Sequence, residues 1–365
     1  MPAILNNGPA ILGSPVLNTN HATAPTHHDS PTAPARPSAL CSIAGIGYYL
    51  PEGILTNHQL MQSVDTSDEW IVERTGIHGR HCAAADEATS DLAYRAAIAA
   101  LADAAVTPSD LDLILLATST ADSPVPCSAC YLQAKLGCRG VPSMDVVAGC
   151  AGFGYGLHLA AASVRSGLHK RVLVVGADCL TRITNYADRQ SCILFGDGAG
   201  AAVVSINGFL DVIYTDIGTD GTAADLICMP AGGSRMPATS LSVATAQHTI
   251  HLRGREVFKA AVRQMSDSIR RAARAVGVGV DAFDLVIPHQ ANARIIEAVG
   301  AQLNVATERL VIDIAETGNT AAASIPIALA RANARGLLKP GQLIVTVGFG
   351  AGTAWACQVL TVKDH

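Results

Sequence analysis

The chain has 365 residues, of which 49% are hydrophobic, 15% charged and only 4% aromatic, and its formal net charge is −5. A chain of this length can bury one large hydrophobic core or two ordinary ones, and its net negative charge argues against a general nucleic-acid-binding protein. No apolar run reaches the roughly 18 residues that a membrane span requires, and the N-terminus lacks the basic and apolar regions of a secretory signal.

The first 41 residues differ in composition from the rest of the chain. They hold seven of the 17 prolines, with one acidic and one basic side chain. Such a segment cannot bury enough apolar surface to offset the entropy of ordering it. We therefore predict that residues 1–41 are a disordered Pro/Ala/Thr-rich tail and that the first strand, in SIAGIGYYLP, begins near Ser42.

From Ser42 onward, strand and helix patterns alternate, which is typical of an α/β protein with largely parallel strands. One pattern occurs twice. The strand LDLILLATS is followed by VPSMDVVAGC, by a helix beginning near Gly152 and by the strand KRVLVVGAD. The strand FDLVIPHQA is likewise followed by RLVIDIAETGN, by a helix and by the strand GQLIVTVGFG. This repetition predicts two similar halves, residues 42–206 and 207–365.

Three chemically capable residues fall at the ends of predicted strands. Cys150 follows the apolar run 144–148, which predicts a buried strand, and it precedes a helix. Asn319 takes the matching place in the second half, and His289 ends the first strand of its unit. Open α/β sheets bind ligands at the carboxyl ends of their strands, so we expect these residues to lie near one another.

Each of the three residues has a chemical and a structural interpretation. The helix start beside Cys150 would favour the nucleophilic thiolate, although most such cysteines are small buried hydrophobes. A neutral His289 could donate or accept one proton, and Asn319 could donate without ionising, so together they could hold an enolate oxygen. Alternatively, His289 is a core histidine and Asn319 is a turn or cap residue.

Six segments of the sequence resemble one known family. AGCAGF, FGDGAGA, PHQAN, ETGNTAAASIP and GFGAG, in this order, together with SDEWIVERTGI, are similar to the β-ketoacyl-acyl-carrier-protein synthase III family of the thiolase superfamily. The resemblance extends from about residue 42 to residue 362. It implies a thiolase-like five-layered α-β-α-β-α fold made of two similar halves, a homodimer, no cofactor, and acyl-CoA and acyl carrier protein as partners.

The resemblance also implies a reaction, the decarboxylative Claisen condensation that initiates fatty acid biosynthesis. Cys150 would take an acyl group from acyl-CoA, and malonyl-carrier protein would then lose carbon dioxide. His289 and Asn319 would stabilise the resulting enolate. The backbone N–H groups of Cys150 and Ala351 would form the oxyanion hole, although the family usually has glycine where this chain has Ala351.

Further positions match the family one at a time. Three match residues that contact the CoA nucleotide, and one matches a residue near the pantetheine. Phe258 matches a wall of the substrate tunnel, and Phe349 matches the aromatic residue beside the nucleophile. In chain order, these CoA- and substrate-binding positions are Trp70, Arg74, Arg189, Phe258, Asn292 and Phe349. Thr353 departs from the family, which often has an aromatic residue there, so the shape of the site near Cys150 is left open.

The resemblance assigns two more features of the surface. Val125 aligns with the residue that closes the far end of the partner subunit's acyl pocket, where members restricted to short primers often have phenylalanine. A set of basic residues would suit an acidic carrier protein, and the alternative is an ordinary solvated helix face. This set is Arg255, Lys259, Arg263 and Arg294.

The cysteines and glycines offer no sign of a cofactor. The ten cysteines show no regular spacing, which indicates reduced thiols in a cytoplasmic protein. Cys127 and Cys130 form a C-x-x-C pair, but without a second pair or nearby histidines we predict helical packing rather than a metal site. The glycine runs do not fit G-x-G-x-x-G after a first strand, so no dinucleotide is expected.

Two other functions are compatible with these residues. A specialised relative could supply a polyketide-type starter, or could transfer the acyl group from Cys150 to a hydroxyl or amine. A non-catalytic partner subunit would typically lose its nucleophile, whereas this chain keeps Cys150, His289 and Asn319. We therefore predict a condensing enzyme.

Overall fold

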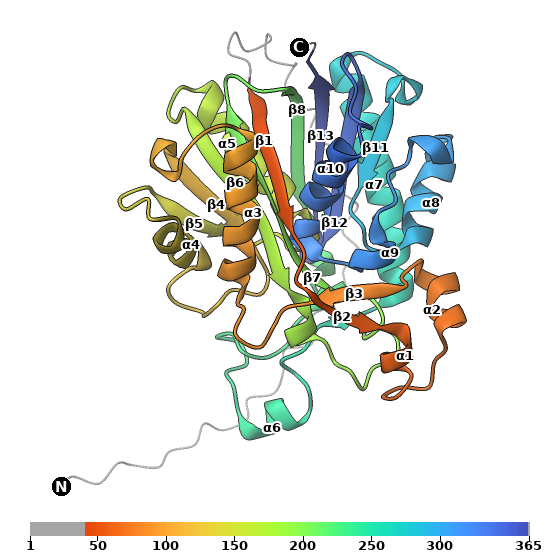
Figure 1. Cartoon of the computed structure of the whole chain (residues 1–365). Helices are drawn as coiled ribbons and strands as arrows, with labels where there is room; N and C mark the ends of the chain where they lie inside the picture. The colour runs from red at the N-terminus through yellow and green to blue at the C-terminus, as the bar shows by residue number, and fades with distance from the viewer. Residues whose placement is uncertain (1–40, 364–365) are drawn as a thin grey trace, which may run out of the picture. The chain divides into compact units, whose positions relative to one another are not determined.

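The computed structural model describes residues 41–363, whose main feature is a nine-stranded sheet with the order β11-β12-β13-β8-β1-β7-β6-β4-β5 (Figure 1). Its strands are β1 (Ser42–Tyr49), β4 (Leu113–Ala117), β5 (Ser143–Val146), β6 (Arg171–Cys179), β7 (Asp197–Ser205), β8 (Leu210–Thr219), β11 (Leu285–Pro288), β12 (Leu343–Gly350) and β13 (Ala354–Val362). Two small antiparallel pairs are β2 (Gly53–Thr56) with β3 (Gly79–Cys82), and β9 (Ile227–Cys228) with β10 (His251–Leu252).

The first strand begins at Ser42, as predicted. Residues 1–40, which make up nearly all of the predicted tail, lie outside the described residues. Cys41 does not belong to a tail, because its side chain is buried and its carbonyl accepts a hydrogen bond from the Val212 N–H at 2.8 Å. The predicted tail was therefore one residue too long at its C-terminal end.

The large sheet consists of two groups of strands joined by a short contact. Between β1 and β8, only Ser42 with Asp211 and Ile43 with Leu210 are paired. On one side of this contact the order is β1-β7-β6-β4-β5, and on the other it is β8-β13-β12-β11. In both groups the third and fourth strands are parallel, and β5 extends the first group by one more parallel strand. The two groups therefore repeat one arrangement, as the duplicated pattern predicted, while the division into two domains at residue 206 stays a prediction.

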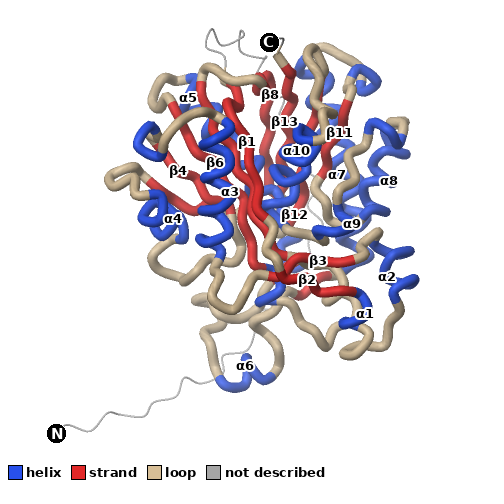
Figure 2. The backbone as a smooth tube through the Cα atoms, viewed as in Figure 1, coloured by secondary structure: helices blue, strands red, loops and turns tan. Residues whose placement is uncertain are grey.

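The helices form three layers that alternate with the two groups of strands (Figure 2). One outer layer holds α3 (Thr89–Asp103) and α4 (Ser128–Leu136), and the other holds α7 (Gly254–Val276) and α8 (Ala293–Leu303). Between them lie α5 (Gly152–Arg165) and α10 (Ser324–Ala334), which pack against strands of both groups. Shorter helices are α1 (Asn57–Leu60), α2 (Asp68–Thr75), α6 (Ser240–Ala244) and α9 (Ile314–Thr317). Of the helices within residues 41–363, none has the length and apolar character to cross a membrane.

The hydrophobic core follows these five layers. One cluster combines Phe153 of α5 and Leu329 of α10 with residues of both groups of strands. A second cluster lies under α3 and α4, and a third lies under α7 and α8. Each helix buries one face of small and branched side chains, in keeping with a chain that is poor in aromatic residues. The α-β-α-β-α fold expected from the resemblance is thus confirmed.

Two predicted strands differ in the structure. The run 144–148 is not buried: β5 is the last strand of the sheet order, Met144 is 47% exposed and Val147 is 79% exposed. RLVIDIAETGN forms no strand and makes only isolated bridges, between Leu310 and Val286 and between Asn319 and Phe195. The reason is local, because the Gln290 side chain bonds backbone groups that a longer ladder would have used. Its amide nitrogen donates to Val311 O, and its amide oxygen accepts the Asp313 N–H.

The close approach of α3 to β1 depends on glycine. A Cβ atom added to Gly47 would lie 2.4 Å from the Ala100 N atom and 2.6 Å from the Ala99 Cβ atom. We predict that Gly47→Ala lowers the free energy of unfolding by about 1–3 kcal/mol, because the helix must shift away. Gly233→Ala is the control, since nothing lies within 4 Å of its added Cβ. Urea denaturation measures both variants, and equal stability of the two would contradict this account.

Candidate active site

Cys150 lies in a short 3-10 turn, Gly149–Ala151, directly before α5. The turn packs backbone to backbone against the segment that follows β12. A Cβ atom added to Gly350 would lie 2.4 Å from the Cys150 N atom, and one added to Gly149 would lie 2.7 Å from the Ala351 N atom. The two proposed oxyanion-hole N–H groups are therefore brought together. Ala351 is not among the residues with positive φ, so alanine is tolerated there.

The expected thiolate is not the resting form of Cys150. Although the residue is partly exposed, burial raises its pKa to about 12, and the negative charge of Asp178 adds to this effect. A backbone hydrogen bond lowers the pKa by less. Burial and the charge of Asp178 therefore favour the neutral thiol, and the influence of the helix start on the thiolate stays a prediction.

His289 lies at the end of β11 and is buried. Its Nδ1 atom is 2.5 Å from the Ser324 Oγ atom, at the start of α10. The same Ser324 Oγ accepts the Gln290 N–H at 3.3 Å. Burial lowers the pKa of His289 to about 3, so the imidazole is neutral at neutral pH.

Asn319 lies in the turn between α9 and α10 and is also buried. Its backbone N–H donates to Leu194 O at 2.8 Å, and its carbonyl accepts the Gly196 N–H at 3.0 Å. The Oδ1 atom of its side chain accepts the Ala321 N–H at 2.9 Å. This bond orients the amide and leaves its nitrogen as the free donor.

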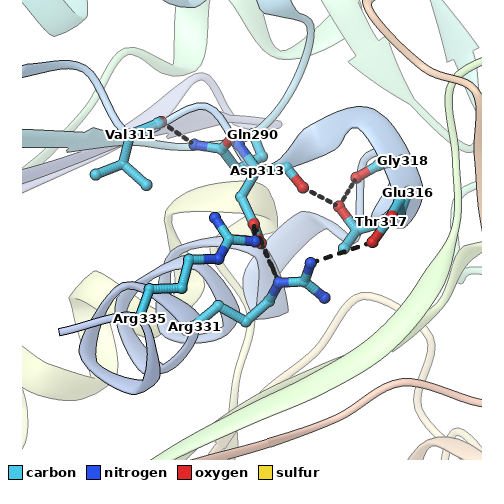
Figure 3. Close-up of polar contacts among 8 residues, drawn as sticks. All are labelled: Gln290, Val311, Asp313, Glu316, Thr317, Gly318, Arg331 and Arg335. Carbon is cyan, nitrogen blue, oxygen red and sulfur yellow. Dashed lines mark hydrogen bonds and ion pairs between the residues drawn. The ribbon is translucent and has the colours of Figure 1, made fainter. Parts of the chain in front are cut away.

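A buried polar network holds the segments that carry His289 and Asn319 (Figure 3). Gln290, next to His289, donates from Nε2 to Pro288 O at 2.7 Å and to Val311 O at 3.0 Å. Its Oε1 atom accepts the Asp313 N–H at 2.7 Å. The end of β11 is thereby tied to the chain that leads into α9.

Asp313 continues this network towards Asn319 (Figure 3). Its carboxylate lies 3.0 Å from Arg331 and 2.8 Å from Arg335, both from the α10 region. The Thr317 hydroxyl lies 3.1 Å from the Asp313 carbonyl oxygen and 3.1 Å from the Gly318 carbonyl oxygen. The turn that presents Asn319 is therefore fixed from both sides.

Four of the predicted CoA-binding residues form one cluster. The guanidinium groups of Arg189 and Arg74 lie 4.2 Å and 5.1 Å from the centre of the Trp70 ring. The Asn292 side chain donates to the Arg74 carbonyl oxygen at 3.0 Å. Phe258 and Phe349 lie elsewhere, in the core under α7 and α8.

The other predicted positions are on the surface. Val125 is 84% exposed. Each basic residue of the predicted docking set is exposed, and none forms an ion pair within the part of the chain that the structure describes: Arg255, Lys259, Arg263 and Arg294. The first three follow one face of α7 at helical spacing.

The C-x-x-C pair lies at the start of α4. Cys127 is its N-cap residue and packs against the core under α3 and α4, whereas Cys130 is exposed. The expected packing role therefore applies to Cys127 only. The two sulfur atoms are 3.4 Å apart, and residues 41–363 contain no group of three or more side chains that could hold a metal.

Sequence reasoning missed Asp178, at the end of β6. Its carboxylate is fully buried near Cys150 and accepts hydrogen bonds from the segment after β4 and from the turn that enters α10. Burial raises its pKa to about 6. A lone acidic residue in the apolar run RVLVVGADC was the available signal, because a buried carboxylate needs specific partners.

Comparison with known proteins assigns the family. Residues 144–221 match the family model described as 3-oxoacyl-[acyl-carrier-protein (ACP)] synthase III, and residues 273–362 match the model of its C-terminal part. The β-ketoacyl-[acyl-carrier-protein] synthase III of Caldanaerobacter subterraneus is 47% identical over 87% of this chain and 96% of its own length.

Solved structures agree with this assignment. The 3-oxoacyl-[acyl-carrier-protein] synthase III of Aquifex aeolicus has a TM-score of 0.81 and 41% identity, over 88% of this chain and 99% of that one. The priming β-ketosynthase of the R1128 polyketide pathway has a TM-score of 0.82 and 32% identity, over 92% of this chain and 99% of that one. The fold is that of a thiolase-like acyltransferase. The chain belongs to the β-ketoacyl-[acyl-carrier-protein] synthase III family, which confirms the resemblance seen in the sequence.

The high pKa of Cys150 leads to a direct prediction. Between pH 7 and pH 10, the logarithm of the rate at which iodoacetamide alkylates Cys150 should rise by about one unit per pH unit, because only the rare thiolate reacts. Peptide mass spectrometry after timed labelling follows Cys150 separately from the other cysteines. A plateau near pH 7 would show instead that the helix start does stabilise the thiolate.

Proposed function

We propose that this chain condenses the acyl group of an acyl-CoA with malonyl-carrier protein and so initiates fatty acid biosynthesis. The observation that carries the proposal is the contact of the Cys150 turn with the Gly350–Ala351 segment. It brings two backbone N–H donors beside a nucleophile, which is the arrangement that stabilises a tetrahedral oxyanion. His289, at the end of β11, and Asn319, in the turn between α9 and α10, supply neutral hydrogen-bond donors.

In the first half-reaction, the Cys150 sulfur attacks the thioester carbonyl of acyl-CoA. A C–S bond to Cys150 forms, the C–S bond to CoA breaks, and the thiol proton ends on the departing CoA sulfur. Since the resting thiol is neutral, no buried charge has to persist before the acyl donor arrives. The N–H groups of Cys150 and Ala351 hold the oxyanion of the tetrahedral intermediate.

In the second half-reaction, malonyl-carrier protein loses carbon dioxide and leaves an enolate. The Asn319 amide nitrogen and the His289 Nε2–H donate to its oxygen. The Ser324 hydroxyl favours this tautomer, because its oxygen already accepts the Gln290 N–H and its proton can be donated to His289 Nδ1. The enolate carbon then attacks the acyl carbonyl on Cys150, and the thiolate leaves and is protonated again.

The proposal also assigns the residues that bind CoA and the acyl chain. The Trp70 ring, flanked by Arg74 and Arg189, presents an aromatic face and two cations to the adenine and phosphates of CoA. Asn292 adjoins this cluster and would contact the pantetheine. Phe258 would form a wall of the acyl tunnel, and Phe349 would be the aromatic residue beside Cys150.

The exposed basic residues suit the acidic surface of a carrier protein, because their charges form no ion pairs with other residues between 41 and 363. They are Arg255, Lys259, Arg263 and Arg294.

A homodimer is part of the proposal. The β5 edge carries exposed Met144 and Val147, and the exposed Val125 precedes α4, which packs on β5. An edge strand with apolar side chains is suited to pairing with a second copy. All ten cysteines are free thiols, which supports a cytoplasmic location.

The triad assignment predicts different defects in the two half-reactions. His289→Ala and Asn319→Ala should each lower malonyl decarboxylation by about 100-fold or more, because each removes a donor to the enolate. Asn319→Ala should still acylate within about tenfold of wild type, whereas Cys150→Ala should not acylate. His158→Ala is the control, since its ring bonds Thr215 on β8. Decarboxylation by Asn319→Ala at the wild-type rate would refute the assigned role.

Val125 leads to a prediction about the primer. Valine is smaller than phenylalanine and leaves room for a few more methylenes, each worth about 0.8 kcal/mol when buried. Two or three of them favour a longer primer by roughly tenfold or more. We expect a medium or branched acyl-CoA to acylate Cys150 at least as well as acetyl-CoA, and Val125→Phe to reverse the order.

The measurement is kcat/KM for acetyl and octanoyl primers. Val243→Phe is the control, because Val243 is another exposed valine, on α6, and this change should leave the order as in wild type. An unchanged ratio in Val125→Phe would show that this residue does not set the depth of the pocket.

A further inference from the structure

Asp178, on β6, links the segment after β4 to the turn that enters α10 at the candidate site. Its Oδ1 atom accepts the Ser119 N–H at 2.7 Å and the hydroxyls of Thr118 and Thr120 at 3.1 Å and 3.2 Å, all from the segment after β4. Its Oδ2 atom accepts the Ala322 N–H at 3.0 Å, from the turn that enters α10. A buried carboxylate with four donors is a rigid connector rather than a spare charge.

The turn that Asp178 reaches is the one that orients Asn319. Ala321 adopts a φ of 42°, a left-handed conformation that costs energy for alanine. Its N–H is held by the Asn319 side chain, and the next N–H, of Ala322, is held by Asp178. The strained Ala321 is thus held by two side-chain acceptors, because Asn319 accepts its N–H and Asp178 accepts the N–H of the next residue.

Glycines bring this turn close to the other half of the site. A Cβ atom on Gly176 of β6 would lie 2.3 Å from the Ala322 carbonyl oxygen, and one on Gly152 would lie 3.3 Å from the Ala322 Cβ atom. Gly152 is two residues from Cys150. Any shift of the turn would therefore change the position of Asn319 relative to the nucleophile.

We propose that Asp178 is a positioning residue that holds the strained turn after Asn319 in place and thereby aims the Asn319 amide at the enolate. The proposal rests on the function assigned above to Asn319. It adds that the two half-reactions depend on Asp178 differently: decarboxylation needs the aimed amide, whereas acylation of Cys150 does not.

The charge of Asp178 provides a readout that a purely structural role would not change. It raises the pKa values of Cys150 and of the neighbouring Cys179, while His289 remains neutral because its pKa is about 3. Removing the charge with little change in shape should therefore make Cys150 easier to deprotonate.

The test uses Asp178→Asn in the full chain. Alkylation of Cys150 at pH 8 should become several-fold faster, because the thiol is easier to deprotonate without the neighbouring charge. The kcat for malonyl decarboxylation should fall by about tenfold or more with KM nearly unchanged. The double variant Asp178→Asn/Asn319→Ala should be no slower than Asn319→Ala alone, because both changes remove the same donor.

Asp197→Asn is the matched control. Asp197 is another buried aspartate, at the start of β7, which accepts from Thr181 and the Ala83 N–H and does not act on Cys150. It should leave the alkylation rate of Cys150 as in wild type. Wild-type rates of both alkylation and decarboxylation in Asp178→Asn would overturn the proposal.

Two further results separate this proposal from the proposed function. Wild-type protein that does not decarboxylate malonyl-carrier protein would contradict the function, while the alkylation test of Asp178 would still stand.

Should Asp178→Asn fail to fold, the pH dependence of alkylation in the wild-type protein is the second test. Because Asp178 ionises near pH 6, the logarithm of the alkylation rate should rise by less than one unit per pH unit between about pH 5 and pH 7. A slope of one throughout would show that Asp178 carries no charge beside Cys150 and would overturn this part of the proposal.

Discussion

The backbone contact between the Cys150 turn and the segment after β12 is the constraint on which the candidate site depends. It joins the two repeated groups of strands at the point where each ends, and it requires glycine at positions 149 and 350. A side chain at either position would push the two turns apart and separate the N–H groups of Cys150 and Ala351. The five-layer fold explains why these ends meet, because α5 and α10 share one hydrophobic cluster and pack against both groups of strands.

Burial is the second feature that shapes the site, and it favours neutral groups. It raises the pKa of Cys150 to about 12 and that of Asp178 to about 6, and it lowers that of His289 to about 3. A neutral thiol, a neutral imidazole and an amide are suited to a reaction whose negative charge appears only transiently, on an enolate or a tetrahedral oxyanion. The donors are then ready before the charge develops, and they need little reorganisation.

Much of the fold was predictable from the sequence because it depends on local patterns. The strand at Ser42, the helix from Gly152 and the repeated unit follow from apolar periodicity and small-residue turns. Features that depend on tertiary neighbours were not predictable. The Gln290 side chain replaces a strand ladder at Val311, and Met144 is exposed because β5 ends the sheet. The protonation of Cys150 depends on the depth of its burial and on Asp178, which no short motif encodes.

The central claim is that Cys150 carries an acyl group that is then joined to a malonyl unit. Intact-protein mass spectrometry tests it, first after incubation with an acyl-CoA and then after addition of malonyl-carrier protein. The account predicts an acyl mass on the peptide that contains Cys150, followed by its loss as the carrier protein gains the mass of a 3-oxoacyl product and releases one carbon dioxide. Acyl-Cys150 that persists with malonyl-carrier protein but is discharged onto a hydroxyl or amine acceptor would contradict the account.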